Sequence, residues 1–255
     1  MKGAEAAIHF AAETHVDRSI DAALEFIRTN VSGAQVMLDA ARECSLRRYL
    51  HISTDEVYGS AVKGSFDEDA PLKPNSPYSA SKAGGDLLVR SHRETYGFPA
   101  IVIRSSNNYG PYQFPEKVIP LFITNLLEGK KVPLYKDGAN IRDWIHVEDN
   151  CRAIELVFER GEAGTVYNVG GGSEITNLVL TRKILALMGK DDSMIEYVAD
   201  RPGHDFRYSI QTERLRRLGF KPKWTFDAGL AETIRWYQTH SDWWKPLKAD
   251  RYTRK

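Results

Sequence analysis

The feature that most constrains the fold is the alternation of short apolar runs with longer segments of helical periodicity. Residues 6–12, 48–53 and 100–104 have the length and composition of buried strands. Between them, residues 23–41 repeat apolar side chains at three- and four-residue steps, and residues 77–96 begin with a proline suited to the first turn of a helix. Strands that alternate with such helices predict an α/β fold built on a parallel sheet with helices on both faces.

The character of the sequence changes after residue 112, where prolines break up the pattern and aromatic residues become frequent. Residues 141–169 then carry strand and helix patterns that we assign to the sheet of the first domain. We therefore expect residues 1–112 together with 141–169 to form one domain. Residues 113–140 together with 170–255 are expected to form a smaller C-terminal α+β lobe.

Composition excludes several classes of protein. The 255 residues are 42% hydrophobic, which suffices for a full core, and the formal net charge of +1 provides no field to attract nucleic acid or an anionic membrane. No apolar run approaches the ~20 residues of a transmembrane helix. Cys44 and Cys151 share no metal-binding or disulfide spacing. We expect a globular cytoplasmic protein with no metal, no nucleic-acid partner and no membrane association.

Tyr78 and Lys82 stand four positions apart in a predicted helix, so their side chains project from the same face and can meet. A tyrosine phenol has an unperturbed pKa of about 10 and is a poor base near neutrality. A neighbouring ammonium group favours the phenolate and would lower that pKa. The spacing by itself also fits two ordinary helix-surface residues. The pair therefore indicates a catalytic role only together with the strand end that precedes it.

Ser53 and Thr54 end the strand before this helix, and Asp55 and Glu56 follow directly. Two carboxyl groups at the mouth of a buried strand repel each other, so their pKa values are expected to separate. One then acts as an acid and the other as a base, which an elimination of water requires. For an isolated Asp-Glu pair, a solvated acidic loop is the alternative interpretation.

These elements occur in an order that resembles the extended short-chain dehydrogenase/reductase superfamily. Further motifs, spread over nearly the whole chain, resemble the dTDP-glucose 4,6-dehydratase family, whose fold has a Rossmann-like NAD-binding sheet and a smaller lobe that binds the nucleotide sugar. The motifs are Thr54-Asp55-Glu56-Val57-Tyr58-Gly59, Tyr78-Ser79-Ala80-Ser81-Lys82, residues 104–113, residues 115–120 and Arg201-Pro202-Gly203-His204-Asp205.

The resemblance implies an NAD-dependent lyase that converts dTDP-glucose to dTDP-4-keto-6-deoxyglucose. Tyr78, helped by Thr54 and Lys82, would take the proton of the 4-hydroxyl group while C4 passes a hydride to NAD⁺. Glu56 would then remove the C5 proton and Asp55 would protonate the departing C6 hydroxyl group, after which the hydride returns to C6. The catalytic residues predicted in this way are Thr54, Asp55, Glu56, Tyr78 and Lys82.

The resemblance also implies binding residues. For NAD they are Ala11, Ala12, Thr14, Thr29, Tyr78, Lys82 and Asn108. For the nucleotide sugar they are Asn107, Lys117, Val118, Pro133, Leu134, Tyr135, Arg142, Asn168, Arg201 and His204. Arg142 and Arg201 suit a diphosphate because a guanidinium group matches phosphate oxygens in a bidentate manner, although either residue also fits a surface ion pair.

Members of the family begin with a strand, a glycine-rich turn and a helix that holds the pyrophosphate, and none of these precedes Met1. We therefore expect a Rossmann-like sheet truncated in its N-terminal half, in a fragment or shortened gene product that binds NAD⁺ weakly and turns over poorly. The strand at residues 6–12 would then be an apolar sheet edge.

Two other functions remain open on the sequence. One is a 4,6-dehydratase acting on UDP-glucose or another nucleotide-glucose, because base selectivity depends on few contacts. The other is a truncated, non-catalytic module that binds a nucleotide sugar. The resemblance further implies a homodimer, formed through the helices at residues 23–41 and 77–96.

Overall fold

The computed structural model describes residues 1–250 apart from the side chain of Asp250. Contacts divide the chain into two compact units. The first unit contains residues 1–106, 150–170 and 203–221, and the second contains residues 107–149, 171–202 and 222–255. The last five residues of the predicted lobe, 251–255, lie outside the described part of the chain.

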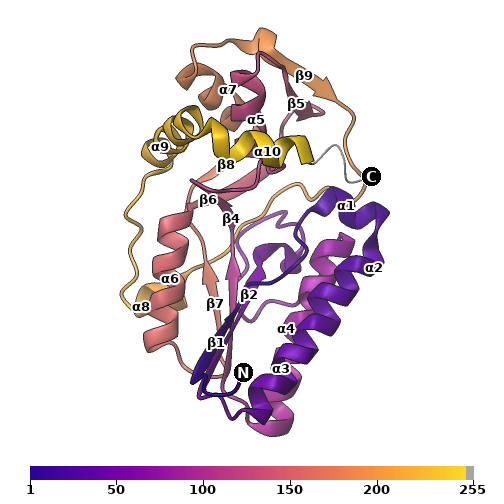
Figure 1. Cartoon of the computed structure of the whole chain (residues 1–255), viewed down its shortest axis with the longest axis vertical. Coiled ribbons are helices and arrows are strands. Elements are labelled where there is room, and N and C mark those ends of the chain that lie inside the picture. The colour runs from indigo at the N-terminus through magenta and orange to yellow at the C-terminus, as the bar shows by residue number, and fades with distance from the viewer. Residues whose placement is uncertain (251–255) are drawn as a thin grey trace. The chain divides into compact units, whose positions relative to one another are not determined.

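The first unit is built on a four-stranded parallel sheet in the order β1-β2-β3-β7 (Figure 1). The central strand β3 (Ala100–Ser105) is buried along its whole length, as an apolar strand covered on both faces must be. Its neighbours are β2 (Arg48–Thr54) and β7 (Val166–Val169), and β1 (Ala6–His9) lies at the edge. The predicted parallel α/β architecture is therefore confirmed.

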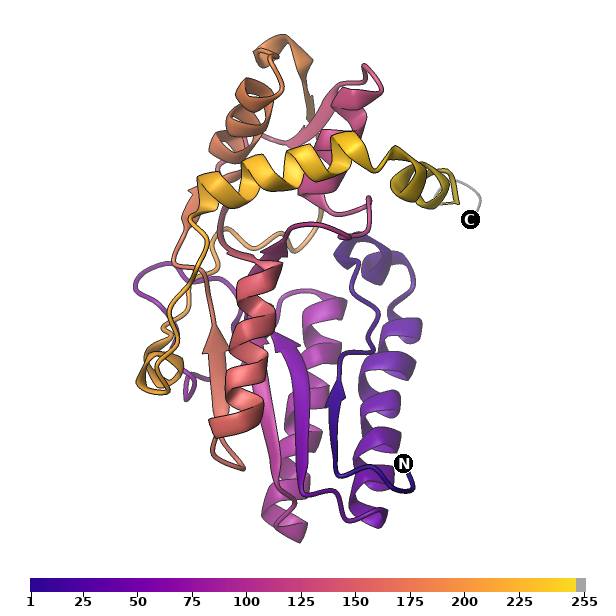
Figure 2. The same ribbon diagram turned by 60° about the vertical axis from the view of Figure 1, so that its left-hand side comes forward.

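Helices cover both faces of this sheet, as Figures 1 and 2 show for α3 and α4 on one side and α6 and α8 on the other. Helix α4 starts with Pro77 behind a reciprocal pair of hydrogen bonds between Ser76 and Ser79, and Gly97 ends it in a left-handed conformation. The helical elements around this sheet are α1 (Val16–Asp21), α2 (Ala23–Phe26), η1 (Ile27–Ser32), α3 (Gly33–Glu43), η2 (Asp55–Tyr58), α4 (Pro77–Tyr96), α6 (Val147–Arg160) and α8 (Glu213–Arg217).

The helix predicted over residues 23–41 is interrupted, because η1 is a π-helical segment between α2 and α3. Its extra residue per turn rotates the two halves of the apolar stripe relative to each other. Leu38 and Ala41 pack into the core of the unit, whereas Leu24 and Ile27 are exposed. The single continuous stripe expected from the sequence was therefore wrong.

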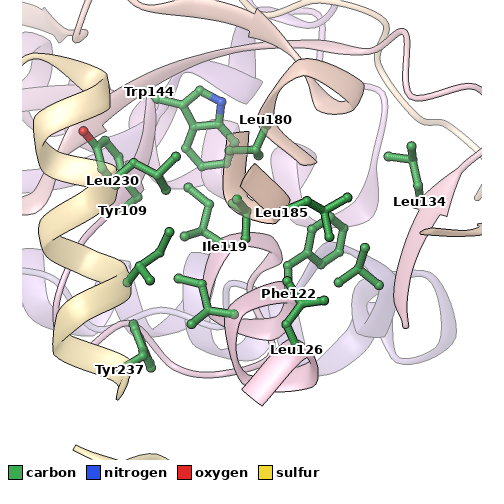
Figure 3. Packing of buried hydrophobic residues seen from close by; sticks show 14 of the residues in the cluster. Tyr109, Ile119, Phe122, Leu126, Leu134, Trp144, Leu180, Leu185, Leu230 and Tyr237 are labelled. Atoms are coloured by element: carbon green, nitrogen blue, oxygen red, sulfur yellow. The ribbon is translucent and has the colours of Figure 1, made fainter. Parts of the chain in front are cut away.

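The second unit surrounds a large apolar cluster, part of which appears in Figure 3. Ile119, Phe122 and Leu126 of α5 point toward α7 and α9, and Trp144 closes the cluster from β6. The elements are β4 (Asn107–Tyr109), α5 (Val118–Leu127), β5 (Val132–Tyr135), β6 (Ile141–His146), β8 (Glu174–Thr176), α7 (Asn177–Leu187), η3 (Asp192–Met194), β9 (Ile195–Val198), α9 (Phe226–Thr239) and α10 (Ser241–Asp250).

The observed units differ from the expected domains at several places. Residues 107–112, expected in the first domain, belong to the second unit, and Gly170 belongs to the first. Strand β6 does not extend the four-stranded sheet; it pairs with β4 and β8 in a separate three-stranded sheet of the second unit. Residues 203–221 belong to the first unit, where Ile210 bridges to Phe66 and α8 lies against β7. The strand pattern of residues 141–146 was predicted from local sequence, which carries no information about the pairing partner.

Among the helices within residues 1–250, none is both long enough and apolar enough to cross a lipid bilayer.

Candidate active site

The acidic pair lies where β2 passes into the 3₁₀ turn η2. Thr54 caps this turn: its hydroxyl oxygen accepts a hydrogen bond from the backbone N–H of Glu56 at 3.3 Å and donates to Oδ1 of Asp55 at 3.3 Å. Asp55 is only 2% exposed and Glu56 is half-buried. The alternative of a solvated acidic loop is therefore wrong for this structure.

Gly59 ends the turn and directs the chain away from the site. Its φ is +79°, and a Cβ atom there would lie 2.2 Å from the carbonyl oxygen of Lys73. A side chain is therefore excluded on both conformational and steric grounds. The approach of residue 73 to this turn keeps the acidic pair at the end of β2.

Tyr78 lies in the first turn of α4 and is 8% exposed. Its backbone N–H donates to Oγ of Ser19 at 3.1 Å, and its ring meets Phe26 edge-on. A hydrogen bond joins its side chain to that of Thr54, and the charges of Glu56 and Asp55 act on it. The phenol, the hydroxyl group and both carboxyl groups therefore converge within the first unit.

The pKa of Tyr78 is raised above its ordinary value. Burial is the largest cause, the negative charges of Glu56 and then of Asp55 add to it, and the hydrogen bond with Thr54 opposes it. We expected Lys82 to lower this pKa. In the chain by itself, burial and the acidic pair instead raise the pKa of Tyr78. Tyr78 therefore favours the protonated phenol.

Lys82 lies one turn after Tyr78 and is 5% exposed. Its Nζ donates to the carbonyl oxygen of Ile52 at 2.6 Å, which anchors α4 to β2 directly below the acidic pair. Burial lowers the pKa of Lys82, and the charge of Asp86 opposes this shift. Burial, followed by the charge of Lys82, also lowers the pKa of His9 and of His51, so both rings beside the amine favour the neutral form.

A buried polar network supports α4 from β3. Arg104 donates to Oδ2 of Asp86 at 2.9 Å and to the hydroxyl oxygen of Tyr58 at 2.7 Å, and its guanidinium lies over the Tyr58 ring. Burial raises the pKa of Tyr58 to about 12, so its hydroxyl is a donor. That hydroxyl donates to Oδ1 of Asn168 at 2.8 Å. The network therefore joins β3, η2, α4 and β7.

Asn168 was predicted to bind the nucleotide sugar, but the structure uses its side chain internally. Besides accepting from Tyr58, its Nδ2 donates to the carbonyl oxygens of Phe66 and Gln211 at 3.2 and 3.0 Å. The residue is fully buried. These contacts argue against a role for this carboxamide in substrate recognition, and they show how a polar strand residue can be structural.

Apart from Tyr78 and Lys82 of α4, the predicted cofactor residues of the first unit lie in two segments. Ala11, Ala12 and Thr14 lie in the extended segment that follows β1, and their side chains are exposed or half-buried. Thr29 lies in the π-helical segment η1 and is half-buried. Asn108 lies in β4 of the second unit, where its carbonyl oxygen accepts a hydrogen bond from Gln113. No cluster of potential metal ligands occurs within the described residues.

Most predicted nucleotide-sugar residues belong to the second unit. Arg142 lies in β6 and donates to the carbonyl oxygen of Ile141. The side chain of Leu134 is buried in the apolar cluster of Figure 3, so only its backbone can contact a ligand. His204 belongs to the first unit. The others in the second unit are Asn107 in β4, Lys117 and Val118 at the start of α5, Pro133 and Tyr135 in β5, and Arg201 after β9.

Sequence reasoning missed Tyr208. Its hydroxyl donates to Oε2 of Glu56 at 3.3 Å and to Oδ2 of Asp205 at 2.9 Å, while Asn75 donates to Oδ1 of Asp205. These contacts bring the segment after residue 202 over the acidic pair. Asp205 stood in a quoted motif, but no periodicity or spacing in the sequence pointed to Tyr208.

Comparison with known proteins agrees with this geometry. A family model described as GDP-mannose 4,6 dehydratase matches residues 3–233. A dTDP-glucose 4,6-dehydratase of Streptomyces niveus is 54% identical over 250 residues, which cover 98% of this chain and 74% of the relative.

Solved structures are similar over the same extent. A double mutant of the dTDP-glucose 4,6-dehydratase DesIV of Streptomyces venezuelae, solved with NAD bound, has a TM-score of 0.95 and 52% identity, covering 96% of this chain and 77% of that one. A UDP-glucose 4-epimerase of Thermotoga maritima has a TM-score of 0.87 and 28% identity, covering 92% of this chain and 77% of that one.

Proposed function

The chain belongs to the dTDP-glucose 4,6-dehydratase family, and from this premise we propose that it is an NAD-dependent lyase acting on a nucleotide sugar. It converts dTDP-glucose to dTDP-4-keto-6-deoxyglucose by loss of water. The observation that carries this proposal is the convergence of Thr54, Asp55 and Glu56 on the phenol of Tyr78.

The residues around the C-terminal ends of β1 and β2 fit the nicotinamide part of NAD. Ala11 and Ala12 present small side chains, which leave room for a flat ring, and ligands of such sheets bind beyond these strand ends. The hydroxyl group of Ser53, at the end of β2, is buried without a hydrogen-bond partner among the described residues. When bound, NAD⁺ supplies an acceptor for the hydride of C4 and then returns that hydride to C6.

Tyr78 is the group that exchanges a proton with the 4-hydroxyl group of the sugar. Thr54 orients the phenol by its hydrogen bond, and Lys82 supplies positive charge from the same face of α4. The raised pKa of Tyr78 favours the protonated phenol in the chain by itself, and the positive charge of a bound nicotinamide ring would favour loss of that proton. This arrangement couples proton removal to the presence of a loaded site.

Glu56 and Asp55 carry out the elimination. Once C4 is a ketone, the C5 proton is acidic, and the carboxylate of Glu56 removes it. Asp55 donates a proton to the departing C6 hydroxyl group, which leaves as water and gives the C5=C6 double bond. Thr54 touches Asp55 and caps Glu56, so one side chain fixes the orientation of both carboxyl groups.

Within the second unit, Arg142 and Arg201 are proposed to hold the diphosphate, assisted by Lys117 at the start of α5. Backbone N–H groups at a helix start favour negative charge, and the α5 helix is ten residues long. Asn107, Val118, Pro133, Leu134 and Tyr135 are proposed to contact the rest of the nucleotide sugar, as is His204 from the first unit.

We also propose that the chain forms a homodimer. Large apolar side chains are exposed on four helical elements of the first unit. They include Leu24 of α2, Ile27 of η1, Val36 of α3 and Leu87 of α4. An exposed apolar surface of this kind favours association. Sedimentation equilibrium of the protein and of its Leu24→Glu variant would test this, and a monomeric wild type would contradict it.

Turnover of different sugar nucleotides tests the proposed function. We expect a 4-keto-6-deoxy product from dTDP-glucose and much slower turnover of UDP-glucose and GDP-mannose, measured by nuclear magnetic resonance of the product. Faster turnover of UDP-glucose would identify the alternative specificity. Binding of all three without any product would identify a non-catalytic module.

A further inference from the structure

We propose that Asp205 is a positioning residue that turns the hydroxyl group of Tyr208 so that this group stabilises Glu56 in its protonated form. That form exists after the base has taken the C5 proton. The inference rests on the proposed function, because it takes Glu56 as the base of the elimination. Tyr208 and Asp205 are 3% and 4% exposed, and both lie in the first unit together with Glu56.

The hydroxyl group of Tyr208 reaches two carboxyl groups but has one hydrogen atom, so it can donate to only one of them at a time. Its oxygen lies 2.9 Å from Oδ2 of Asp205 and 3.3 Å from Oε2 of Glu56. Hydrogen bonds between two oxygens usually measure about 2.5–3.0 Å, so the contact with Asp205 is the better place for the hydrogen. When Tyr208 donates to Asp205, its oxygen presents a lone pair to Glu56.

A lone pair directed at Glu56 is matched by a protonated carboxyl group and not by an ionised one. An ionised carboxyl group only accepts hydrogen bonds, whereas a protonated one also donates. Glu56 changes from the first form to the second when it takes the C5 proton. It then donates to Tyr208, and Tyr208 donates to Asp205, so the hydrogen bonds form a continuous chain that favours the proton on Glu56.

Asn75 fixes the orientation of the Asp205 carboxyl group. Its Nδ2 donates to Oδ1 of Asp205 at 2.6 Å, while Oδ2 accepts from Tyr208, so the two carboxyl oxygens face separate donors. Asn75 directly precedes Ser76, the residue that caps α4. The start of the helix that carries Tyr78 therefore also orients the group that directs the Tyr208 hydroxyl.

The segment at residues 203–210 is fastened to the loop that follows η2. The N–H groups of Phe206 and Arg207 both donate to Oγ of Ser60 at 3.2 Å. Gly203 allows a second close approach, because its φ is +65° and a Cβ atom there would lie 2.9 Å from the carbonyl oxygen of Asn75. Backbone contacts on both sides thus hold the hydroxyl group of this segment beside the base.

Other titratable groups lie around Glu56 on two elements. Asp55 precedes it in η2, and the charges of both carboxyl groups act on Tyr78 of α4. These two neighbours are unchanged in the variants described next. Differences among the variants therefore report on Asp205 and on the hydroxyl group that it directs.

Asp205→Asn reverses the hydroxyl group of Tyr208 while keeping the size of the side chain. Because Asn75 donates toward the Oδ1 position, the new carboxamide turns its oxygen to Asn75 and its Nδ2 to Tyr208. This Nδ2 donates to the Tyr208 oxygen, so the hydroxyl hydrogen turns to Glu56 and favours its ionised form.

The double variant Asn75→Ala with Asp205→Asn separates the hydroxyl direction from the lost charge of Asp205. Without the Asn75 amide group, the carboxamide can turn and present its oxygen to Tyr208, which restores the original direction although the charge is still missing. Asp39→Asn is the matched control, because this carboxyl group of α3 also accepts from a side-chain amide group, that of Gln35.

Two measurements are made on each protein. The first is kcat and KM for dTDP-glucose as a function of pH. The second is the titration of Glu56 without substrate, followed by carbon-13 nuclear magnetic resonance of glutamate labelled at the side-chain carboxyl carbon. The resonance that is missing in Glu56→Gln identifies Glu56.

We expect Asp205→Asn to lower kcat about tenfold with little change in KM, because its base holds the C5 proton less well. The acidic limb of the kcat profile and the Glu56 titration should both move to lower pH, since the ionised form is now favoured. The double variant should recover part of the kcat and part of the titration shift. Asp39→Asn should behave as the wild type does.

An unchanged Glu56 titration in Asp205→Asn would overturn the inference. A double variant that titrates as Asp205→Asn does would also overturn it, because the shift would then come from the lost charge and not from the hydroxyl group. If the wild type forms no product from dTDP-glucose, the proposed function fails, and the titration still decides whether Asp205 directs the hydroxyl group toward a protonated Glu56.

Discussion

The hydroxyl group of Tyr208 lies 3.3 Å from Oε2 of Glu56, although 152 positions separate the two residues in the sequence. The same hydroxyl group donates to Asp205 at 2.9 Å, so Tyr208 is oriented by one carboxyl group and touches another. Glu56 is the proposed base of the elimination. We therefore predict that Tyr208 positions the proposed base, Glu56.

The first prediction follows from this contact. Tyr208→Phe removes the hydroxyl group and keeps the ring, so we expect kcat for dTDP-glucose to fall about tenfold with little change in KM. Thermal unfolding should shift little, because the ring remains packed. Tyr197→Phe, an exposed tyrosine of β9 in the second unit, is the control. A kcat equal to that of the wild type would exclude a role for Tyr208.

The second prediction separates oxidation from elimination. Glu56→Gln leaves Tyr78 able to exchange its proton but removes the base that acts at C5, so turnover should fall about 10²- to 10⁴-fold. Reduced nicotinamide should then accumulate after dTDP-glucose is added, visible in its near-ultraviolet absorbance. Tyr78→Phe should lose turnover without any such accumulation. Accumulation in both variants, or in neither, would contradict the proposed order of steps.

The third prediction concerns pH and stability. Burial lowers the pKa of His51 well below 6.5, so as the pH falls below 6.5 the unfolded state takes up a proton that the folded state refuses. The free energy of unfolding should therefore decrease with falling pH, by up to about 1.4 kcal/mol per pH unit for this group.

Replacing the histidine tests this cause. In His51→Asn, the free energy of unfolding, measured by urea unfolding, should decrease less steeply as the pH falls below 6.5. The control His240→Asn replaces an exposed histidine and should keep the pH dependence of the wild type. His9 retains its own contribution in both variants, since its pKa is also lowered. Equal slopes in the wild type and His51→Asn would show that another group governs acid sensitivity.

The fourth prediction concerns the buried pair of Arg104 and Asp86, whose side chains are 7% and 2% exposed. Arg104→Leu leaves Asp86 without its partner inside the core, and we expect a loss of about 3–5 kcal/mol in the free energy of unfolding. The double variant Arg104→Leu with Asp86→Leu should recover part of this loss. Chemical unfolding of the three proteins measures the effect; a double variant less stable than Arg104→Leu would contradict it.

Much of the fold was accessible from the sequence because the signals were local. Helix α4 begins at Pro77 and ends before Gly97, as its proline and glycine indicate. The π-helical interruption at η1 was not accessible, because the apolar spacing of residues 23–41 gives no sign of it. The pairing of β6 with β4 and β8 was equally hidden, since strand partners are chosen over long range.

The candidate site, like the fold, could be predicted from the sequence only in part. Thr54, Asp55, Glu56, Tyr78 and Lys82 were named from motifs, and the structure brings the first four together because β2 and α4 are adjacent in the first unit. The direction of the Tyr78 pKa was not accessible, because it depends on burial. Tyr208 was missed because its importance lies in a partner that is distant in the sequence.

Isotope transfer tests the central claim most directly, namely that one phenol and two carboxyl groups move the protons while a hydride passes from C4 to C6 of a single sugar. The protein is incubated with NAD⁺ and dTDP-glucose carrying deuterium at C4, and the product is examined by nuclear magnetic resonance. We predict dTDP-4-keto-6-deoxyglucose with the deuterium at C6, and with a solvent-derived hydrogen at C5. A product that lacks deuterium at C6, or no 4-keto product at all, would contradict the account.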